Sequence, residues 1–290
     1  MEELIDRLEE VIREHVLEAM PEDRSGHLAT EPLPEVLMSY ETWRSRLIPA
    51  QPRCPHLSPE LQASPKAVEH KAALDAIVRK IEAGDDLTPH LSESIDKAHA
   101  RDRMLADLGV HHLHLSTQLG PNGRFVERGN DLLFVAFKPG DAYLIGIYEH
   151  VTDWARKDIL ATIARNWPEV GVVHELKSVI GLTHEFDDAD RLEIQKAGVS
   201  VGAIETDGKV FMTLGQSFAG EPYSAQRLRM VVMHMLDDWR EHIEERLAEA
   251  TVAVDAAAGR EVTGDWEPVV YNECAGLQRE DVFHPIAALS

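Results

Sequence analysis

Three short apolar segments between residues 110 and 149 constrain the fold more than any other feature of the sequence. They read VHHLHLST, DLLFVAF and AYLIGIY, with Gly120–Gly123, Gly129-Asn130 and Pro139-Gly140-Asp141 between them. Runs of this length, rich in aromatic and β-branched residues and bounded by Gly or Pro, are typical of strands. We therefore predict three strands, the last two joined as a hairpin over Pro139-Gly140-Asp141.

Helical patterns flank these strands on both sides. Residues 2–19 repeat apolar side chains at helical spacing, and further helices are predicted at 64–83, 93–107, 154–166, 184–197 and 224–250. The dipeptide Asp207-Gly208 predicts a second hairpin. The fold class expected is α+β, with a small antiparallel or mixed central sheet, flanking helices, a helical N-terminal region and a long C-terminal helix.

Breaker residues suggest the organisation of the chain. Residues 20–65 contain eight prolines and are interpreted as an extended connector inside a helical N-terminal region, residues 1–103. The α+β core is expected at 104–223 and the long helix at 224–250. Residues 251–290 are expected to form a partly ordered tail, in which residues 267–272 are the best candidate for an edge strand.

The distribution of charge along the chain limits which molecules the protein can bind. The formal net charge of −22 divides into −9 for residues 1–100, −1 for residues 101–170 and −12 for residues 171–290. Duplex-binding proteins carry a basic stripe, so this charge opposes tight nonspecific DNA binding, whereas a local site for RNA or a nucleotide in the central segment is still allowed. The acidic start and the lack of a long apolar run predict a cytoplasmic protein without a membrane partner. Cys54 and Cys274, far apart and outside any CxxC motif, are expected to be free thiols.

The central segment also resembles known proteins. MLADLGVHHLHLS, RGNDLLFVAF, AYLIGIYEH and ILATIARNWPE, within residues 104–168, resemble an uncharacterised bacterial family that pairs a helical N-terminal part with an HHLHL strand and an NWPE helix end. More distantly, the strands resemble the sheet of RelE-type ribonuclease toxins, where an Arg enters one strand and a His or Lys ends the last. Arg128 and His150 occupy comparable places. This resemblance implies a ribonuclease in a toxin–antitoxin or phage-defence setting, although that family is small and basic.

Histidines are the candidate catalytic residues. His112 and His114 share one face of the first strand, and His150 follows the hairpin that comes next. Imidazoles titrate near neutral pH and suit general acid–base catalysis, while Arg124 and Arg128 are suited to holding a phosphate. We therefore predict a metal-independent phosphodiesterase or ribonuclease that needs no cofactor.

Several alternatives remain open at this point. The histidines are also consistent with sheet residues that have no catalytic role, or with metal ligands assisted by Glu149 and Asp153. The repeated His-x-Ser/Thr pattern also suggests a cyclic-phosphodiesterase-like site, and it occurs at His56–Ser58, His90–Ser92, His114–Ser116 and His150–Thr152. Finally, the chain is consistent with a non-enzymatic acidic adaptor, in which the helix at 224–250 contacts a protein partner or a second copy. The discriminating feature is whether the histidines and arginines line one pocket.

Overall fold

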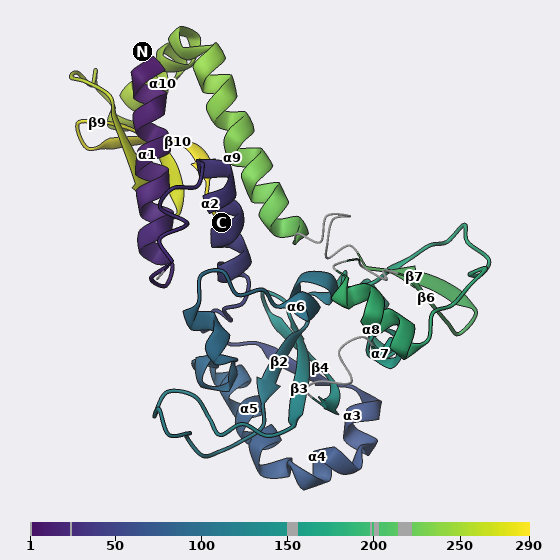
Figure 1. Ribbon diagram of the computed structural model, residues 1–290. Helices are drawn as coiled ribbons and strands as arrows, with labels where there is room; N and C mark the ends of the chain where they lie inside the picture. The colour runs from purple at the N-terminus through teal and green to yellow at the C-terminus, as the bar shows by residue number, and fades with distance from the viewer. Residues whose placement is uncertain (1, 24, 150–155, 198, 200–202, 214–221) are drawn as a thin grey trace. The chain divides into compact units, whose positions relative to one another are not determined.

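The computed structural model describes residues 2–23, 25–149, 156–197, 199, 203–213 and 222–290 (Figure 1). The chain divides into two compact units. The terminal unit contains residues 1–44, 97–99 and 224–290, and the central unit contains residues 45–96 and 100–223. Both units combine helices with a sheet, so the predicted α+β class is confirmed. Among the described residues, no helix is both long enough and apolar enough to cross a membrane.

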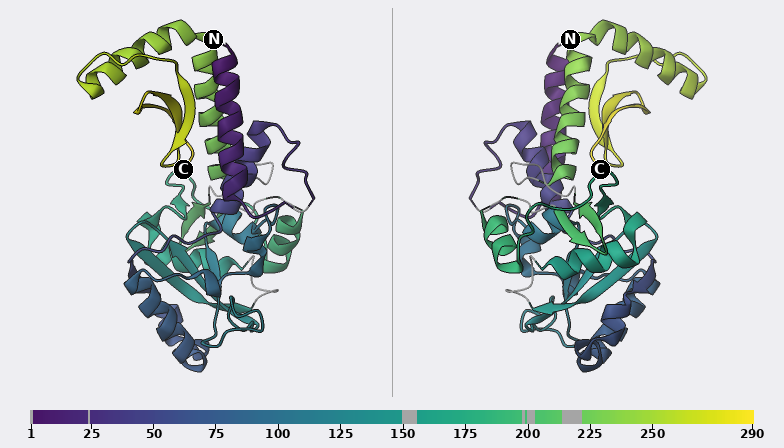
Figure 2. Two further views of the ribbon diagram at one scale, coloured as in Figure 1. Left: turned by 90° about the vertical axis from the view of Figure 1, so that its left-hand side faces the viewer. Right: turned by 90° about the vertical axis from the view of Figure 1, so that its right-hand side faces the viewer.

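The terminal unit packs helices against a three-stranded antiparallel sheet (Figure 2). Its helices are α1 (Glu2–Ala19), α2 (Leu33–Arg44), α9 (Tyr223–Glu241) and α10 (Ile243–Ala258), and its strands are β8 (Glu267–Tyr271), β9 (Cys274–Arg279) and β10 (Val282–Ala288). The predicted amphipathic helix at residues 2–19 is confirmed as α1. Its residues Ile5, Leu8, Ile12 and Val16 are fully buried at helical spacing, and α1 packs against the sheet and α2.

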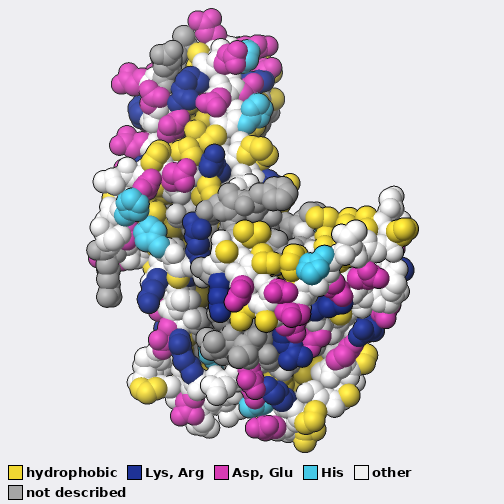
Figure 3. All heavy atoms as spheres, turned by 45° about the vertical axis from the view of Figure 1, so that its right-hand side comes forward, with side chains coloured by type: hydrophobic (Ala, Val, Ile, Leu, Met, Phe, Trp, Pro, Cys, Tyr) yellow, Lys and Arg dark blue, Asp and Glu magenta, His cyan; other side chains and the backbone are white. Residues whose placement is uncertain are grey.

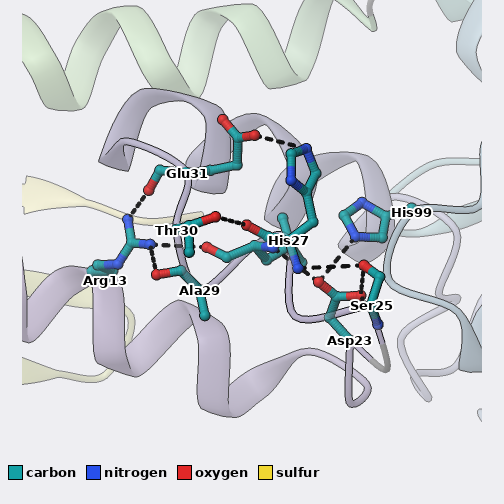
Figure 4. A network of polar contacts seen from close by, with 9 residues as sticks. Arg13, Asp23, Ser25, His27, Ala29, Thr30, Glu31 and His99 are labelled. Atoms are coloured by element: carbon teal, nitrogen blue, oxygen red, sulfur yellow. Dashed lines mark hydrogen bonds and ion pairs between the residues drawn. The ribbon is translucent and has the colours of Figure 1, made fainter.

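The loop between α1 and α2 is held by polar contacts within the terminal unit (Figure 4). Arg13 of α1 donates hydrogen bonds to three loop carbonyls, those of Leu28, Ala29 and Glu31. Asp23 accepts a hydrogen bond from the Ser25 hydroxyl at 2.6 Å and lies 3.3 Å from His99. These contacts fix a loop whose described residues form no helix or strand.

The C-terminal part of the terminal unit differs from the sequence prediction. The helix predicted at 224–250 is two helices that meet at His242, and the second continues to Ala258. The predicted tail at 251–290 contains the three strands, of which only the first was anticipated. Their turns contain Asn272, Glu273 and Glu280 with positive φ, and such residues give a weaker turn signal than Gly.

The central unit is built on a mixed four-stranded sheet with strand order β1-β4-β3-β2. The strands are β1 (Cys54–Leu57), β2 (His111–His114), β3 (Asp131–Phe137) and β4 (Asp141–Glu149). The three predicted strands and the predicted β3–β4 hairpin are confirmed. β1 pairs parallel with β4 and lies in the segment that was interpreted as a connector. That segment also contains α2, so the connector prediction is wrong over much of its length.

Helices cover both faces of this sheet. The helices concerned are α3 (Pro59–Ala63), α4 (Pro65–Glu69), α5 (Lys71–Ala83), α6 (Arg103–Leu108) and α7 (Lys157–Asn166). Leu113 and Leu133 face α5, while Leu132 and Phe134 face α6 and α7. A smaller sheet packs near α7 with order β5-β7-β6, and it is accompanied by α8 (Asp188–Lys196). Its strands are β5 (His174–Glu175), β6 (Ala203–Thr206) and β7 (Lys209–Met212), and the predicted Asp207-Gly208 hairpin joins the last two.

Two predicted helices of the central region are divided. The helix predicted at 64–83 is α4 followed by α5, with a break at His70. The helix predicted at 93–107 is a 3-10 turn at Glu93–Asp96 followed by α6. The cause of the second break is that residues 97–99 belong to the terminal unit, where Ala98 is buried.

Candidate functional site

The two described histidines of the predicted site lie in the protein interior. His112 and His114 share one face of β2, as predicted, and pair with Phe134 and Leu132 of β3. Their exposed fractions are only 7% and 3%. His112 Nδ1 lies 3.4 Å from Asp102 Oδ2. These side chains are therefore poorly placed to exchange protons with a polymeric substrate in solvent.

The predicted phosphate-binding arginines are exposed and paired with carboxylates. Arg124 lies 2.7 Å from Asp96, and Arg128 lies 3.5 Å from Glu93. Both carboxylates belong to the 3-10 turn Glu93–Asp96. His150, the third predicted catalytic residue, falls outside the described residues. Among the described residues of the predicted site, the histidines are thus buried and the arginines are exposed and paired with carboxylates.

Another group of polar side chains meets where α4 contacts the ends of β3 and β4. Ser64 caps α4 by accepting a hydrogen bond from the Lys66 backbone, and Pro65 occupies the first turn. Lys66 and His70 are four residues apart, so they lie on one face of this helical turn. The local sequence therefore directs an ammonium group and an imidazole to the same side.

The strand ends supply two carboxylates to this group. Asp131 is the first residue of β3 and pairs with Glu149, the last residue of β4. Lys66 Nζ lies 2.6 Å from Asp131 Oδ1 and 3.8 Å from Glu149 Oε1, while His70 Nε2 lies 2.9 Å from Asp131 Oδ2. Lys66, His70, Asp131 and Glu149 are together called the strand-end cluster.

The four side chains of the strand-end cluster differ in how far they are exposed to solvent. The side chains are 17% exposed at Asp131, 23% at His70, 32% at Lys66 and 58% at Glu149. Burial raises the pKa of the Asp131 carboxyl, but hydrogen bonds from Lys66 and His70 outweigh this and hold the pKa below its usual range. Asp131 is therefore an ionised anchor beneath two donors, and Glu149 faces solvent beside them.

Two groups of donor atoms are close enough to share a metal ion among the described residues. One consists of Glu69, His70 and Asp131, and the other consists of Cys54, His56 and Asp141. In the first group the Lys66 ammonium already contacts Asp131, which opposes a cation at that carboxylate. In the second group Asp141 pairs with His56, at 2.7 Å.

The central unit also has a surface hollow beside the start of α7. Its lining includes Arg156, Lys157, Asp158 and Glu185. Arg156 pairs with Asp158 at 2.7 Å, and Lys157 pairs with Glu185. The Lys157–Glu185 pair connects α7 to the segment that precedes α8, so we assign the hollow a structural role.

Sequence reasoning missed most of the strand-end cluster. The sequence pattern places Lys66 and His70 only in a helix and Asp131 only at the start of a strand, whereas it offers Glu149 as a candidate metal ligand. One usable signal was present, namely a Ser-Pro helix start followed by Lys and His at i and i+4. Comparison of the chain with protein-family models, curated proteins and solved structures found no match.

Proposed function

We propose that the protein is a metal-independent phosphodiesterase that cleaves RNA, with the strand-end cluster as its active site. The observation that carries this proposal is the Asp131 carboxylate, which binds both a lysine and a histidine within 3 Å beside the exposed Glu149. The proposal keeps the ribonuclease function predicted from the sequence and assigns it to different residues.

The cluster contains the groups that RNA cleavage requires. Glu149 accepts the proton of the ribose 2′-hydroxyl, whose oxygen forms a bond to phosphorus. His70 donates a proton to the departing 5′-oxygen as the P–O5′ bond breaks, so a 2′,3′-cyclic phosphate and a 5′-hydroxyl result. Asp131 binds His70 at Nε2, which orients the ring and leaves Nδ1 for proton transfer.

Lys66 provides the positive charge that the reaction needs. Negative charge on the non-bridging phosphate oxygens increases in the transition state, and a preorganised ammonium stabilises it. Lys66 lies between Asp131 and Glu149, so its position is set by the two strand ends. Asp131 and Glu149 lie within residues 101–170, which carry a net charge of only −1 and are the part of the chain least repulsive to phosphate.

The test is cleavage of a fluorescent RNA oligonucleotide in the presence of EDTA. We expect the wild-type protein to release cyclic-phosphate products and to leave DNA, or RNA with a 2′-deoxy scissile position, intact. Lys66→Met, His70→Gln and Glu149→Gln should each reduce the rate at least about 100-fold, the usual contribution of acid–base and electrostatic groups.

A matched control is available on the adjacent helix. Lys71 and Asp75 form an exposed ion pair on α5, at 2.8 Å, so Lys71→Met removes the same charge one turn away and should leave the rate unchanged. Absence of RNA cleavage by the wild type would refute the proposal. Cleavage that requires Mg²⁺ or Mn²⁺ would refute the metal-independent mechanism.

Docking of a basic partner is a second candidate function, favoured by the charge of the terminal unit. This unit has 11 Lys/Arg against 25 Asp/Glu, a balance of −14. Acidic side chains dominate the face of its helices seen in Figure 3. On α9, Met230 and Val231 are 64% and 43% exposed and offer apolar contacts to a partner or a second copy. Binding of a lysine-rich peptide that weakens steeply with salt would support this function.

A further inference from the structure

We propose that Cys54, His56 and Asp141 form a Zn²⁺ site where β1, an edge strand of the central sheet, pairs with β4. Alternate residues of a strand share a face, so Cys54 and His56 point to the same side of β1. β1 pairs parallel with β4, and their register sets Cys54 opposite Asp141. Strand pairing therefore brings the three side chains together.

The donor atoms are already close to one another. The thiol sulfur, an imidazole nitrogen and a carboxylate oxygen all lie within 4.8 Å of one another, and His56 Nε2 is 2.7 Å from Asp141 Oδ1. Zn²⁺ takes sulfur at ~2.3 Å and nitrogen or oxygen at ~2.0–2.2 Å, so small side-chain rotations complete the site. Cys54 is an exposed free thiol, and the side chains of His56 and Asp141 are 38% and 41% exposed. The three side chains therefore have room to rotate.

Neighbouring aromatic rings support the histidine. The His56 ring stacks on Tyr143 with centroids 4.9 Å apart and planes inclined by 17°. Tyr143 in turn meets the edge of Trp167 at 5.1 Å. Arg53 precedes Cys54 but contacts the Phe137 ring, at 5.2 Å, and the Lys138 carbonyl. The imidazole is thus held by packing, while the adjacent cation is engaged elsewhere.

The donor set indicates which metal binds. A thiolate, an imidazole and a carboxylate suit Zn²⁺, whereas Mg²⁺ and Ca²⁺ prefer oxygen ligands alone. The thiolate and the carboxylate together neutralise the two charges of the ion. Three protein ligands leave the fourth tetrahedral position to water, as in zinc sites that are accessible to substrates. The inference does not depend on the proposed ribonuclease, because none of these residues belongs to the strand-end cluster.

The experiment titrates the metal-free protein with Co²⁺, which replaces Zn²⁺ and reports sulfur ligation by a near-ultraviolet charge-transfer band. We expect this band to saturate at one equivalent and to disappear when Zn²⁺ is added. Cys54→Ser should abolish the band. His56→Ala and Asp141→Asn should each weaken Zn²⁺ binding by more than the ~10–100-fold that loss of a merely supporting residue causes.

Two control variants make the outcome specific. Cys274→Ser removes the other cysteine, which is half-buried in β9, and should leave the band unchanged. Asp131→Asn alters the strand-end cluster and should also leave it unchanged. Absence of a sulfur band in the wild type, or its persistence in Cys54→Ser, would overturn the zinc site. Circular dichroism of each metal-free variant checks that the fold is intact.

Discussion

His111 faces the opposite side of β2 from His112 and His114. Its Nε2 donates to the Ser45 carbonyl at 3.2 Å, and its ring contacts the edge of Phe137 at 5.5 Å. Burial lowers the pKa of His111 to about 4, and nearby Asp102 only partly opposes this shift. The folded protein therefore holds this imidazole neutral at pH values where the unfolded chain binds a proton.

This shift predicts acid sensitivity of the central unit. Between the unfolded pKa of 6.5 and the folded pKa of about 4, the unfolded state binds more protons, so the free energy of unfolding falls as the pH falls. Because the side chain is partly exposed, we expect a loss of about 1–2 kcal/mol over this range. Urea titrations at pH 7 and pH 4.5 measure the free energy of unfolding. Between these two pH values it should fall less in His111→Gln than in the wild type.

His184 provides the comparison for this prediction. It is exposed in the same unit, so His184→Gln should retain the full pH dependence. An unchanged pH dependence in His111→Gln would contradict the assignment of the effect to His111.

For single residues of the candidate site, the sequence predicted the features that depend on neighbours along the chain and missed those that depend on tertiary contacts. Strand periodicity correctly predicted that His112 and His114 share a face, because that depends only on neighbours along the chain. Their burial depends on α6 and α7, which no local pattern assigns to that face. Lys66 and Asp131 are 65 residues apart, so their contact depends on tertiary structure that a single sequence does not encode locally.

Helices and strands with clear periodicity and turn residues were predicted from the sequence. Elements that form only because they pair with a distant strand were not. Helix α1 and strands β3 and β4 have clear periodicity and turns. Strand β1 has only four residues, one of them Pro55, and it exists because β4 offers a parallel edge. The prediction at 93–107 failed for a related reason, since residues 97–99 pack in the other unit.

The end of α5 gives a test at the element scale. Gly84 caps this helix with φ of +76°, and an added Cβ would lie 2.5 Å from the Pro52 nitrogen and 2.7 Å from the Gln51 carbonyl carbon. Gly84→Ala should therefore combine left-handed strain of about 1–2 kcal/mol with a steric cost of about 1–3 kcal/mol. The shift in urea midpoint measures the loss of stability.

Gly109 separates these two contributions. It caps α6 with φ of +65°, and an added Cβ would meet nothing within 4 Å. Gly109→Ala should thus show the strain alone, about 1–2 kcal/mol. Equal losses in the two variants would show that the contact between the end of α5 and residues 51–52 is unimportant.

At the scale of the whole molecule, the chain interleaves two units that have separate cores. The terminal unit closes its core with residues from the beginning and the end of the chain, such as Leu8 and Leu277. The central unit forms its core from residues between them, including Leu133 and Ile77. No local pattern in the sequence indicated that residues 1–44 and 224–290 fold together.

Separate cores predict that a cavity in one unit destabilises that unit first. Leu277→Ala and Leu133→Ala each truncate a fully buried side chain, which costs about 2–5 kcal/mol. Hydrogen exchange followed by mass spectrometry should show that Leu277→Ala speeds exchange in α1, α9 and β8–β10, while Leu133→Ala speeds it in α5 and β2–β4. The paired variants control for each other, because they remove the same atoms. Faster exchange throughout the chain in both variants would mean that the two units unfold as one cooperative body, and the interleaved segments would then couple the cores energetically.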